Sequence, residues 1–457
     1  MQLGLRLVGE NMRSIKAIML VSIFLLAPLS GCFGEDSVSE VVADISVDQE
    51  QTLVAIRGQP YFLEVDSNVD FKVHRSPGMF FVDEYNVYRD SMNWTYSSEV
   101  TTVELLIIDS ELNELELSVS TIDDEIIWNA TLTLEDSSEM MLVDGRRAFD
   151  TIDMLTTDWN NRWCASASIH DGGANYEAAA NGMAAIWETY GFDEVVVTHY
   201  EDDPDQINVV GYKYGRLYPD QIILLGGHFD VAYAFTPPGG GTSEGANDDT
   251  SGSTVSMEVA QAIASREWDH TVAAALWACE EEGLLGSAAF VSHLPENQSI
   301  KAYMNFDMVS LNYPIVPPPG YGPYDLGIAT AGANEDNLSQ MNEWVRMVVE
   351  DEMSFSDTPQ NDIHWASEET CASDHCSFFT NDYATFNFFS AGGDISFWQE
   401  WHSGTDNLDF MVTKAGGSDN LGDGFNTLVW TSLNLFIHID NTDDSFQGRW
   451  YSSSDEE

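Results

Sequence analysis

The segment QIILLGGHFD, residues 221–230, indicates the fold class most clearly. It opens with a continuous apolar run, which is typical of a strand buried on both faces. Two glycines and then His228 follow the run, so a potential metal ligand stands where the strand ends. A lone histidine is more often structural than a ligand, and the function of this one depends on what the rest of the chain brings to it.

Helical and strand-like patterns alternate on both sides of this stretch. We expect strands over 207–214, 221–226, 272–278 and 302–306, and helices over 178–190, 251–265 and 284–293. Such alternation forms βαβ units and predicts a mixed, largely parallel sheet with helices on both faces. In sheets of this kind, functional groups collect at the carboxyl ends of the strands.

Residues 33–145 have a different pattern. Leu115, Leu117 and Val119 alternate with polar residues, and residues 128–134 do the same, which predicts half-buried strands. No cluster of histidines, cysteines or paired acids with metal-ligand spacing occurs there. We therefore predict a small β-rich domain with a structural or positioning role, a cleavable pro-segment being the alternative. The α/β domain would span 146–440, followed by an acidic tail over 441–457.

Charge sets this chain apart. It has 457 residues, of which 44% are hydrophobic, enough for a folded core. Its 76 acidic and 17 basic residues give a net charge of −59. A field of that sign repels nucleic acids and anionic membrane surfaces, so we expect neither as a partner.

The N-terminus resembles an export signal. Residues 17–31 form an uncharged, mostly apolar run of 15 residues after a basic flank, shorter than the roughly 20 residues that a membrane-spanning helix needs. The run ends in LSGC, residues 29–32, which resembles the lipobox of lipoproteins. We expect residues 1–31 to be a signal peptide, with the start at Met1 or Met12, and Cys32 to be lipidated. The protein would then lie outside the cytoplasm, anchored to the cell membrane as a lipoprotein or secreted.

Two acidic segments are potential ligand sources. The loop GANDDTSG, residues 245–252, opens a predicted helix, and Asp249 or Ser251 can cap that helix while Asp248 points elsewhere. A carboxylate can bridge two cations with its two oxygens. The second segment, residues 280–282, consists of three glutamates after an apolar strand. Their mutual repulsion favours bound cations, and a metal ligand beside a general base explains the run.

Two further residues complete the set. Asp307 follows another apolar strand, and His402 lies in the loop WHSGTD with a carboxylate, Asp406, four residues on. The potential ligands are two histidines and three carboxylates: His228, Asp248, Glu281, Asp307 and His402. Nitrogen and oxygen ligands of this kind suit two zinc ions per chain, with positions left open for water.

Five motifs, GGHFD, GANDDTSG, EEEGLLGS, NFDM and WHSGTDN, resemble in this order those of the co-catalytic two-zinc aminopeptidases, typified by aminopeptidase Y and secreted bacterial leucyl aminopeptidases. Glutamate carboxypeptidase, glutaminyl cyclase and the transferrin receptor are relatives. The resemblance covers about residues 146–440 and implies a zinc exopeptidase-like fold.

By this resemblance, seven side chains take roles in the site. They are His228 and Asp307 as ligands of one zinc, Glu281 and His402 as ligands of the other, Asp248 as the bridge, Glu280 as general base, and Asp230 as the residue that orients His228. The family pattern of base, ligand, any residue and glycine ends here at Gly283, which makes Glu282 the variable position.

The segment CASDHC, residues 371–376, resembles the Ser-Asp-His pocket segment of the family. Asp374 and His375 are therefore predicted to lie at the substrate pocket. A disulfide between Cys371 and Cys376 is a hypothesis that accompanies this resemblance, because a disulfide can lie near this segment in secreted members.

The resemblance implies a metal-dependent exopeptidase that acts on peptides. An acidic site suits the cationic α-amino group of a substrate, which favours an aminopeptidase over a carboxypeptidase. A glutaminyl cyclase-like enzyme or a non-catalytic, receptor-like domain on the same fold would also fit the resemblance. The only membrane contact that we expect is through the lipid anchor, and the oligomeric state stays open.

Overall fold

The computed structural model of the protein describes most of the chain after residue 42. The described residues are 43–49, 52–56, 58–107, 114–135, 145–164, 173–199, 207–233, 243–309, 324–331, 363–367, 372–392 and 400–442. The predicted signal peptide, Cys32, Cys371 and residues 443–457 of the predicted tail lie outside them.

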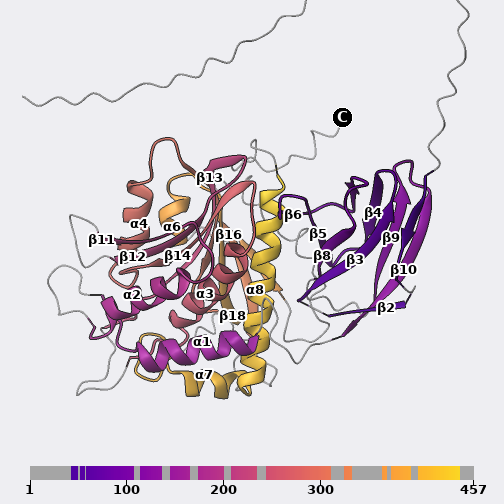
Figure 1. Ribbon diagram of the computed structural model, residues 1–457. Helices are drawn as coiled ribbons and strands as arrows, with labels where there is room; N and C mark the ends of the chain where they lie inside the picture. The colour runs from indigo at the N-terminus through magenta and orange to yellow at the C-terminus, as the bar shows by residue number, and fades with distance from the viewer. Residues whose placement is uncertain are drawn as a thin grey trace, which may run out of the picture. The chain divides into compact units, whose positions relative to one another are not determined.

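Residues 45–135 form a β-rich region, as the sequence predicts. Its strands are β1 (Ile45–Val47), β2 (Thr52–Ile56), β3 (Pro60–Ser67), β4 (Phe71–Arg75), β5 (Met79–Val82), β6 (Tyr88–Arg89), β7 (Asn93–Tyr96), β8 (Thr102–Ile107), β9 (Glu114–Thr121) and β10 (Ile126–Glu135). They form two five-stranded sheets, with the orders β1-β3-β8-β5-β6 and β2-β10-β9-β4-β7 (Figure 1). Alternate residues of β9, among them Leu115, Leu117 and Val119, join a core shared by both sheets, because the period-two pattern puts them on one face.

The α/β part follows. Its helices are α1 (Gly145–Asp158), α2 (Tyr176–Trp187), α3 (Thr250–Ala264), α4 (Leu285–Ser292), α6 (His375–Phe379), α7 (Leu408–Ala415) and α8 (Ser418–Asp440). Its strands are β11 (Glu194–His199), β12 (Ile207–Lys213), β13 (Tyr218–His228), β14 (His270–Trp277), β15 (Ser299–Phe306), β16 (Tyr324–Ala331), β17 (Ile363–Ser367) and β18 (Thr385–Gly392). Each helix and strand expected from the sequence is present, with ends shifted by at most three residues.

The eight strands form one mixed sheet, in the order β11-β12-β14-β13-β15-β18-β16-β17. The four central strands, β14, β13, β15 and β18, are mutually parallel. Antiparallel pairing occurs between β11 and β12, β12 and β14, and β18 and β16. The predicted parallel sheet is therefore confirmed at the centre, where the strands are joined through helices.

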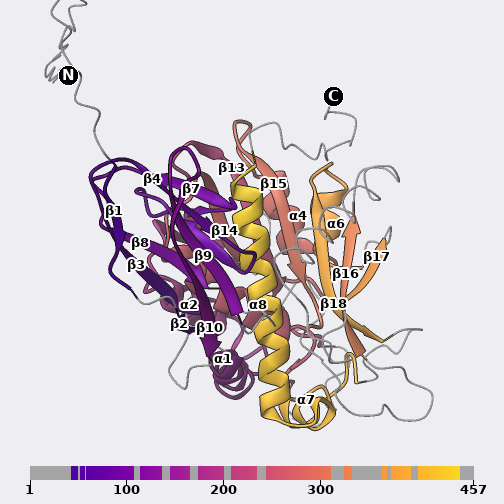
Figure 2. The same cartoon turned by 90° about the vertical axis from the view of Figure 1, so that its right-hand side faces the viewer.

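Helices cover both faces of this sheet. Ile223 and Leu225 of β13 point into a core shared with α2, α3 and α8, whereas Ile222 and Leu224 point into a second core with Phe290 of α4 and residues of α6. The long helix α8, yellow in Figures 1 and 2, also contacts α1 and α3. Residues 222–227 of β13 are buried on both faces, so their sequence is continuously apolar rather than alternating.

The β-rich region contacts the α/β part through Arg266, which follows α3. Its guanidinium donates hydrogen bonds to the Tyr88 hydroxyl at 3.1 Å, the Asn86 side-chain oxygen at 2.5 Å and Glu104 at 2.5 Å. Among the described helices, none is both long enough and apolar enough to span a membrane.

Candidate metal centre

The parallel strands bring the predicted ligands to one edge of the sheet. His228 is the last residue of β13, and Asp307 directly follows β15. Gly226 of β13 pairs with Asn305 of β15, so these two strands end side by side. Glu280 and Glu281 lie in the turn after β14, the neighbour of β13 on its other side.

Asp248 lies in the turn that leads into α3. The neighbouring Asp249 caps this helix, because its carboxylate accepts a hydrogen bond from the Gly252 backbone N–H at 2.9 Å. This leaves Asp248 to face the strand ends, one of the two arrangements that the sequence allowed.

The carboxylate of Asp248 lies between the two histidines. Its Oδ1 is 3.3 Å from His228 Nε2, and its Oδ2 is 3.2 Å from His402 Nε2. Glu281 Oε2 lies 2.8 Å from His402 Nε2, and Asp307 Oδ1 lies 3.9 Å from His228 Nε2. All five predicted ligands are thus brought together, with Asp248 in the position of a bridge.

Two groups of side chains in the described residues are close enough to hold one cation each. One contains Asp248, Glu281 and His402, and the other contains His228, Asp307 and Glu280. Glu280 Oε2 lies 3.8 Å from His228 Nε2, so the predicted general base adjoins the metal position formed by His228 and Asp307. Glu282 belongs to neither group, which agrees with the register inferred from Gly283.

The donor atoms fit bound cations. His228 Nε2, Asp248 Oδ2, Glu281 Oε1 and Asp307 Oδ1 are buried atoms that make no hydrogen bond within the described structure. A buried polar atom without a partner costs free energy, which a coordinated cation offsets. Imidazole nitrogens with carboxylate oxygens are ligands that zinc accepts.

The electrostatics of the metal-free site reflect this crowding. Burial, followed by the negative charge of Asp248, raises the pKa of Glu281 to about 7. Burial likewise raises the pKa of Asp307 to about 6 and that of Glu280 well above its usual range. Burial also acts to raise the pKa of Asp248, but the imidazoles of His228 and His402, at 3.3 and 3.2 Å, lower it to about 2. The bridging position therefore keeps its negative charge even without a metal.

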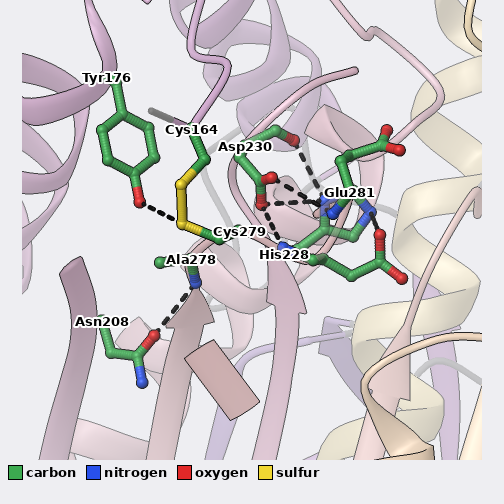
Figure 3. The surroundings of a disulfide bond; sticks show 9 residues. Cys164, Tyr176, Asn208, His228, Asp230, Ala278, Cys279 and Glu281 are labelled. Atoms are coloured by element: carbon green, nitrogen blue, oxygen red, sulfur yellow. Dashed lines mark hydrogen bonds and ion pairs between the residues drawn. A yellow bond between two sulfur atoms is a disulfide. The ribbon is translucent and has the colours of Figure 1, made fainter. Parts of the chain in front are cut away.

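Asp230 connects His228 to the glutamate turn. His228 Nδ1 lies 3.1 Å from the backbone carbonyl oxygen of Asp230 and 3.5 Å from its carboxylate Oδ1. The same carboxylate accepts hydrogen bonds from the backbone N–H groups of Glu280 and Glu281, at 3.0 and 3.4 Å (Figure 3). The resemblance predicts that Asp230 orients His228, and in the structure its contacts reach both this histidine and the predicted base Glu280.

The predicted pocket residues Asp374 and His375 are both buried, at the start of α6. The described pocket beside the centre is lined by other side chains: Ala232, Ser243, Gly245, Asp248, His402, Ser403 and Asp406. Burial raises the pKa of Asp374 to about 7, and the negative charge of Asp374 adds to the raised pKa of Glu280. The structure therefore places Asp374 near the base and outside the lining of this pocket.

The cysteines pair in a way that the sequence did not indicate. Cys164 and Cys279 form a disulfide across 115 residues, next to Glu280 (Figure 3). Cys376 is also disulfide-bonded, but its predicted partner Cys371 lies outside the described residues, so that pairing stays a prediction. The sequence shows only that Cys279 directly precedes the acidic run, which does not identify its partner.

Comparison with known proteins finds similarity to peptidases over part of the chain. The model of Peptidase family M28 matches residues 208–423. The chain is 32% identical to the probable leucine aminopeptidase 2 of Aspergillus oryzae over 33% of its own length, and 36% identical to an aminopeptidase of Pseudomonas aeruginosa over 25%. It spans only 27% and 20% of the length of these two relatives.

Among solved structures, LapB from Legionella pneumophila aligns with a TM-score of 0.48 at 19% identity, over 64% of this chain and 72% of that one. The match to the family contains His228, Asp248, Glu281, Asp307 and His402, which the fold brings together in space. The region that the Peptidase family M28 model matches thus contains the whole candidate metal centre.

Proposed function

We propose that the protein is a metal-dependent aminopeptidase that removes N-terminal residues from peptides with two zinc ions. The observation that carries this proposal is the position of Asp248, whose two oxygens each face one histidine. His228 and Asp307 would hold one zinc, Glu281 and His402 the other, and Asp248 would contact both.

When bound, the two zinc ions would polarise the scissile carbonyl and lower the pKa of the attacking water. Glu280 would take the proton from that water, which is supported by its position 3.8 Å from His228 Nε2 and directly before Glu281. It would then return the proton to the leaving amine. The Asp230 carboxylate accepts a hydrogen bond from the Glu280 backbone N–H and so keeps Glu280 in place.

The charge of the site favours the α-amino end of a substrate. The described pocket is lined by Asp248 and Asp406 and by no lysine or arginine. Arg162 contributes positive charge to this region, but it is buried and donates hydrogen bonds to the protein itself. A carboxypeptidase would need an accessible cation to bind the substrate carboxylate, and none lines the described pocket.

The proposal is tested with matched substrates on purified, zinc-loaded protein. Aminoacyl amides and peptides blocked at the carboxyl end should be cleaved, whereas peptides blocked at the amino end should not. Cleavage restricted to peptides with a free carboxyl end would identify a carboxypeptidase. Cyclisation of N-terminal glutamine by a protein with one zinc would identify a cyclase, and absence of both zinc and activity would favour a receptor-like domain.

We also propose that the protein is exported and lipidated at Cys32. The signal-like run before Cys32 supports this, and so does the Cys164–Cys279 disulfide, since disulfides persist mainly outside the cytoplasm. Mass spectrometry of the mature protein should find an N-terminal, lipid-modified Cys32, and a Cys32→Ser variant should lack the modification. A mature chain that keeps residues before Cys32 would refute the proposal.

A further inference from the structure

The segment between α1 and α2 contacts three of the loops that form the metal centre. We call residues 159–164 the anchoring segment. Within it, the Asn161 backbone N–H donates to the carbonyl of Ser243 at 2.7 Å, and the Asn161 side-chain oxygen accepts from the Ser243 N–H at 2.8 Å. Ser243 lies in the chain that leads to Asp248. The anchoring segment is thus attached to the loop of the bridging ligand.

Arg162 extends from the anchoring segment into the interior and is 1% exposed. Its Nε donates to the carbonyl oxygen of Phe229 at 2.7 Å, and its Nη2 donates to the Thr250 hydroxyl at 2.6 Å. Phe229 is the residue after His228, and Thr250 begins α3. One guanidinium therefore connects the loop of His228 to the turn that carries the bridging ligand.

The remaining nitrogen of this guanidinium, Nη1, donates to the carbonyl oxygens of Leu155 and Trp159 at 3.0 and 2.9 Å. All three nitrogens of Arg162 thus have fixed partners, two of them in the loops of the metal centre. A fork of donors in one plane sets distances and angles that a flexible ammonium group does not set.

The disulfide attaches the same segment to the glutamate turn. Cys164 bonds to Cys279, the residue directly before Glu280 (Figure 3). Cys279 has φ = +54°, in the left-handed region that a residue with a side chain adopts at a cost in free energy. This conformation turns the chain from the end of β14 toward Glu280. The disulfide fixes the side chain of Cys279 at this point.

We propose that Arg162 and the Cys164–Cys279 disulfide are positioning residues for the metal centre, which together hold the His228, Asp248 and Glu280–Glu281 loops at the spacing that two metal ions require. The inference rests on the proposed function of this site. Neither group touches substrate or metal, and both act through the backbone next to the ligands.

A positioning role and simple stabilisation of the fold affect different measured properties. A residue that only stabilises the fold alters the melting temperature and leaves the native site intact. Displacement of the glutamate turn would instead weaken zinc binding at Glu281 and misplace Glu280. It would lower kcat more than it raises KM, because neither Glu280 nor Glu281 lines the described pocket.

The test compares three variants of the full chain: Arg162→Lys, the double variant Cys164→Ser/Cys279→Ser, and Arg266→Lys. The last is a matched control, since Arg266 also uses all three guanidinium nitrogens but binds residues of the β-rich region. Zinc affinity is measured by competition with a chromophoric chelator, alongside kcat, KM and the melting temperature.

We expect the first two variants to bind zinc about 10- to 100-fold more weakly, the usual effect of losing a residue that orients metal ligands. Their kcat at saturating zinc should fall with little change in KM. Arg266→Lys should lower the melting temperature and leave zinc affinity and kcat at wild-type values.

Unchanged zinc affinity and kcat in both variants, even with lower melting temperatures, would overturn the inference and leave the proposed function standing. If the double cysteine variant does not fold, Arg162→Lys decides the question, because its disulfide is intact. A wild-type protein that binds no zinc would instead refute the proposed function itself, and the inference with it.

Discussion

Asp406 accepts a hydrogen bond from the backbone N–H of Asp248 at 3.0 Å, and thereby ties the loop of His402 to the loop of the bridging carboxylate. Its other oxygen accepts the N–H of Asn247 at 2.9 Å. Asp406 is 3% exposed and also lines the described pocket. The carboxylate four residues after His402, to which the sequence assigned no role, therefore orients the backbone on both sides of the Asn247–Asp248 peptide bond.

Replacement of Asp406 by alanine should loosen this connection. Both N–H groups would lose their acceptor, and Asp248 would no longer be held between His228 and His402. We expect zinc affinity to fall about 10- to 100-fold, as for other residues that orient metal ligands. Chelator competition measures the effect, and an affinity equal to that of the wild type would show that Asp406 is dispensable for the site.

Glu280→Gln should separate metal binding from turnover. Glutamine keeps the size of the side chain but cannot accept the proton of the attacking water. Zinc content should stay at the wild-type level while kcat falls about 100- to 10,000-fold, the usual contribution of a general base. A variant with wild-type kcat would remove Glu280 from the mechanism.

The register of the three glutamates is tested by a matched pair of substitutions. Glu281 Oε2 lies 2.8 Å from His402 Nε2, whereas Glu282 belongs to neither potential metal group in the described structure. Glu281→Ala should therefore lose zinc affinity, and Glu282→Ala should keep it. The opposite result would shift the assignment by one residue.

Metal removal should make stability depend on pH. Burial raises the pKa of Glu281 to about 7 and of Asp307 to about 6 in the metal-free protein. In the unfolded chain these carboxyl groups titrate near 4. The folded state then binds more protons than the unfolded state between about pH 4 and 7, so the free energy of unfolding falls as the pH rises through this window.

Melting temperatures of the chelator-treated protein should accordingly decrease from pH 5 to pH 7. Added zinc should raise them more at pH 7 than at pH 5, because it binds the deprotonated carboxylates of the folded state. A melting temperature that rises with pH in the metal-free protein would contradict the raised pKa values of Glu281 and Asp307.

Local patterns were enough to predict the fold class and, in the α/β part, three helices and four strands. The alternation at Leu115, Leu117 and Val119 identified β9, and the apolar run at 222–225 identified β13, because side-chain periodicity depends on the local backbone alone. The strand β11 was not predicted. It pairs antiparallel with β12 at the edge of the sheet and directly precedes that strand in the chain, so it does not belong to a βαβ unit that the alternation would reveal.

The candidate site, too, was predicted only in part. His228, Glu281 and Asp307 lie at or just after strand ends, and Asp248 and His402 lie in loops that precede helices, so a sequence motif locates each ligand. Arg162 and the Cys164–Cys279 disulfide were not predicted, because their roles arise only when distant segments meet in the folded chain. Spacing of 115 residues between two cysteines carries no information about pairing.

The most direct test of the two-metal centre is the zinc content of the purified protein after dialysis, compared with that of Asp248→Ala. The wild type should retain about two zinc ions per chain, because each of two metal positions has nitrogen and oxygen ligands and both positions use the Asp248 carboxylate. Asp248→Ala should lose zinc and activity together. A wild type with a single zinc ion, or an Asp248→Ala variant that stays fully metallated and active, would refute the two-metal centre.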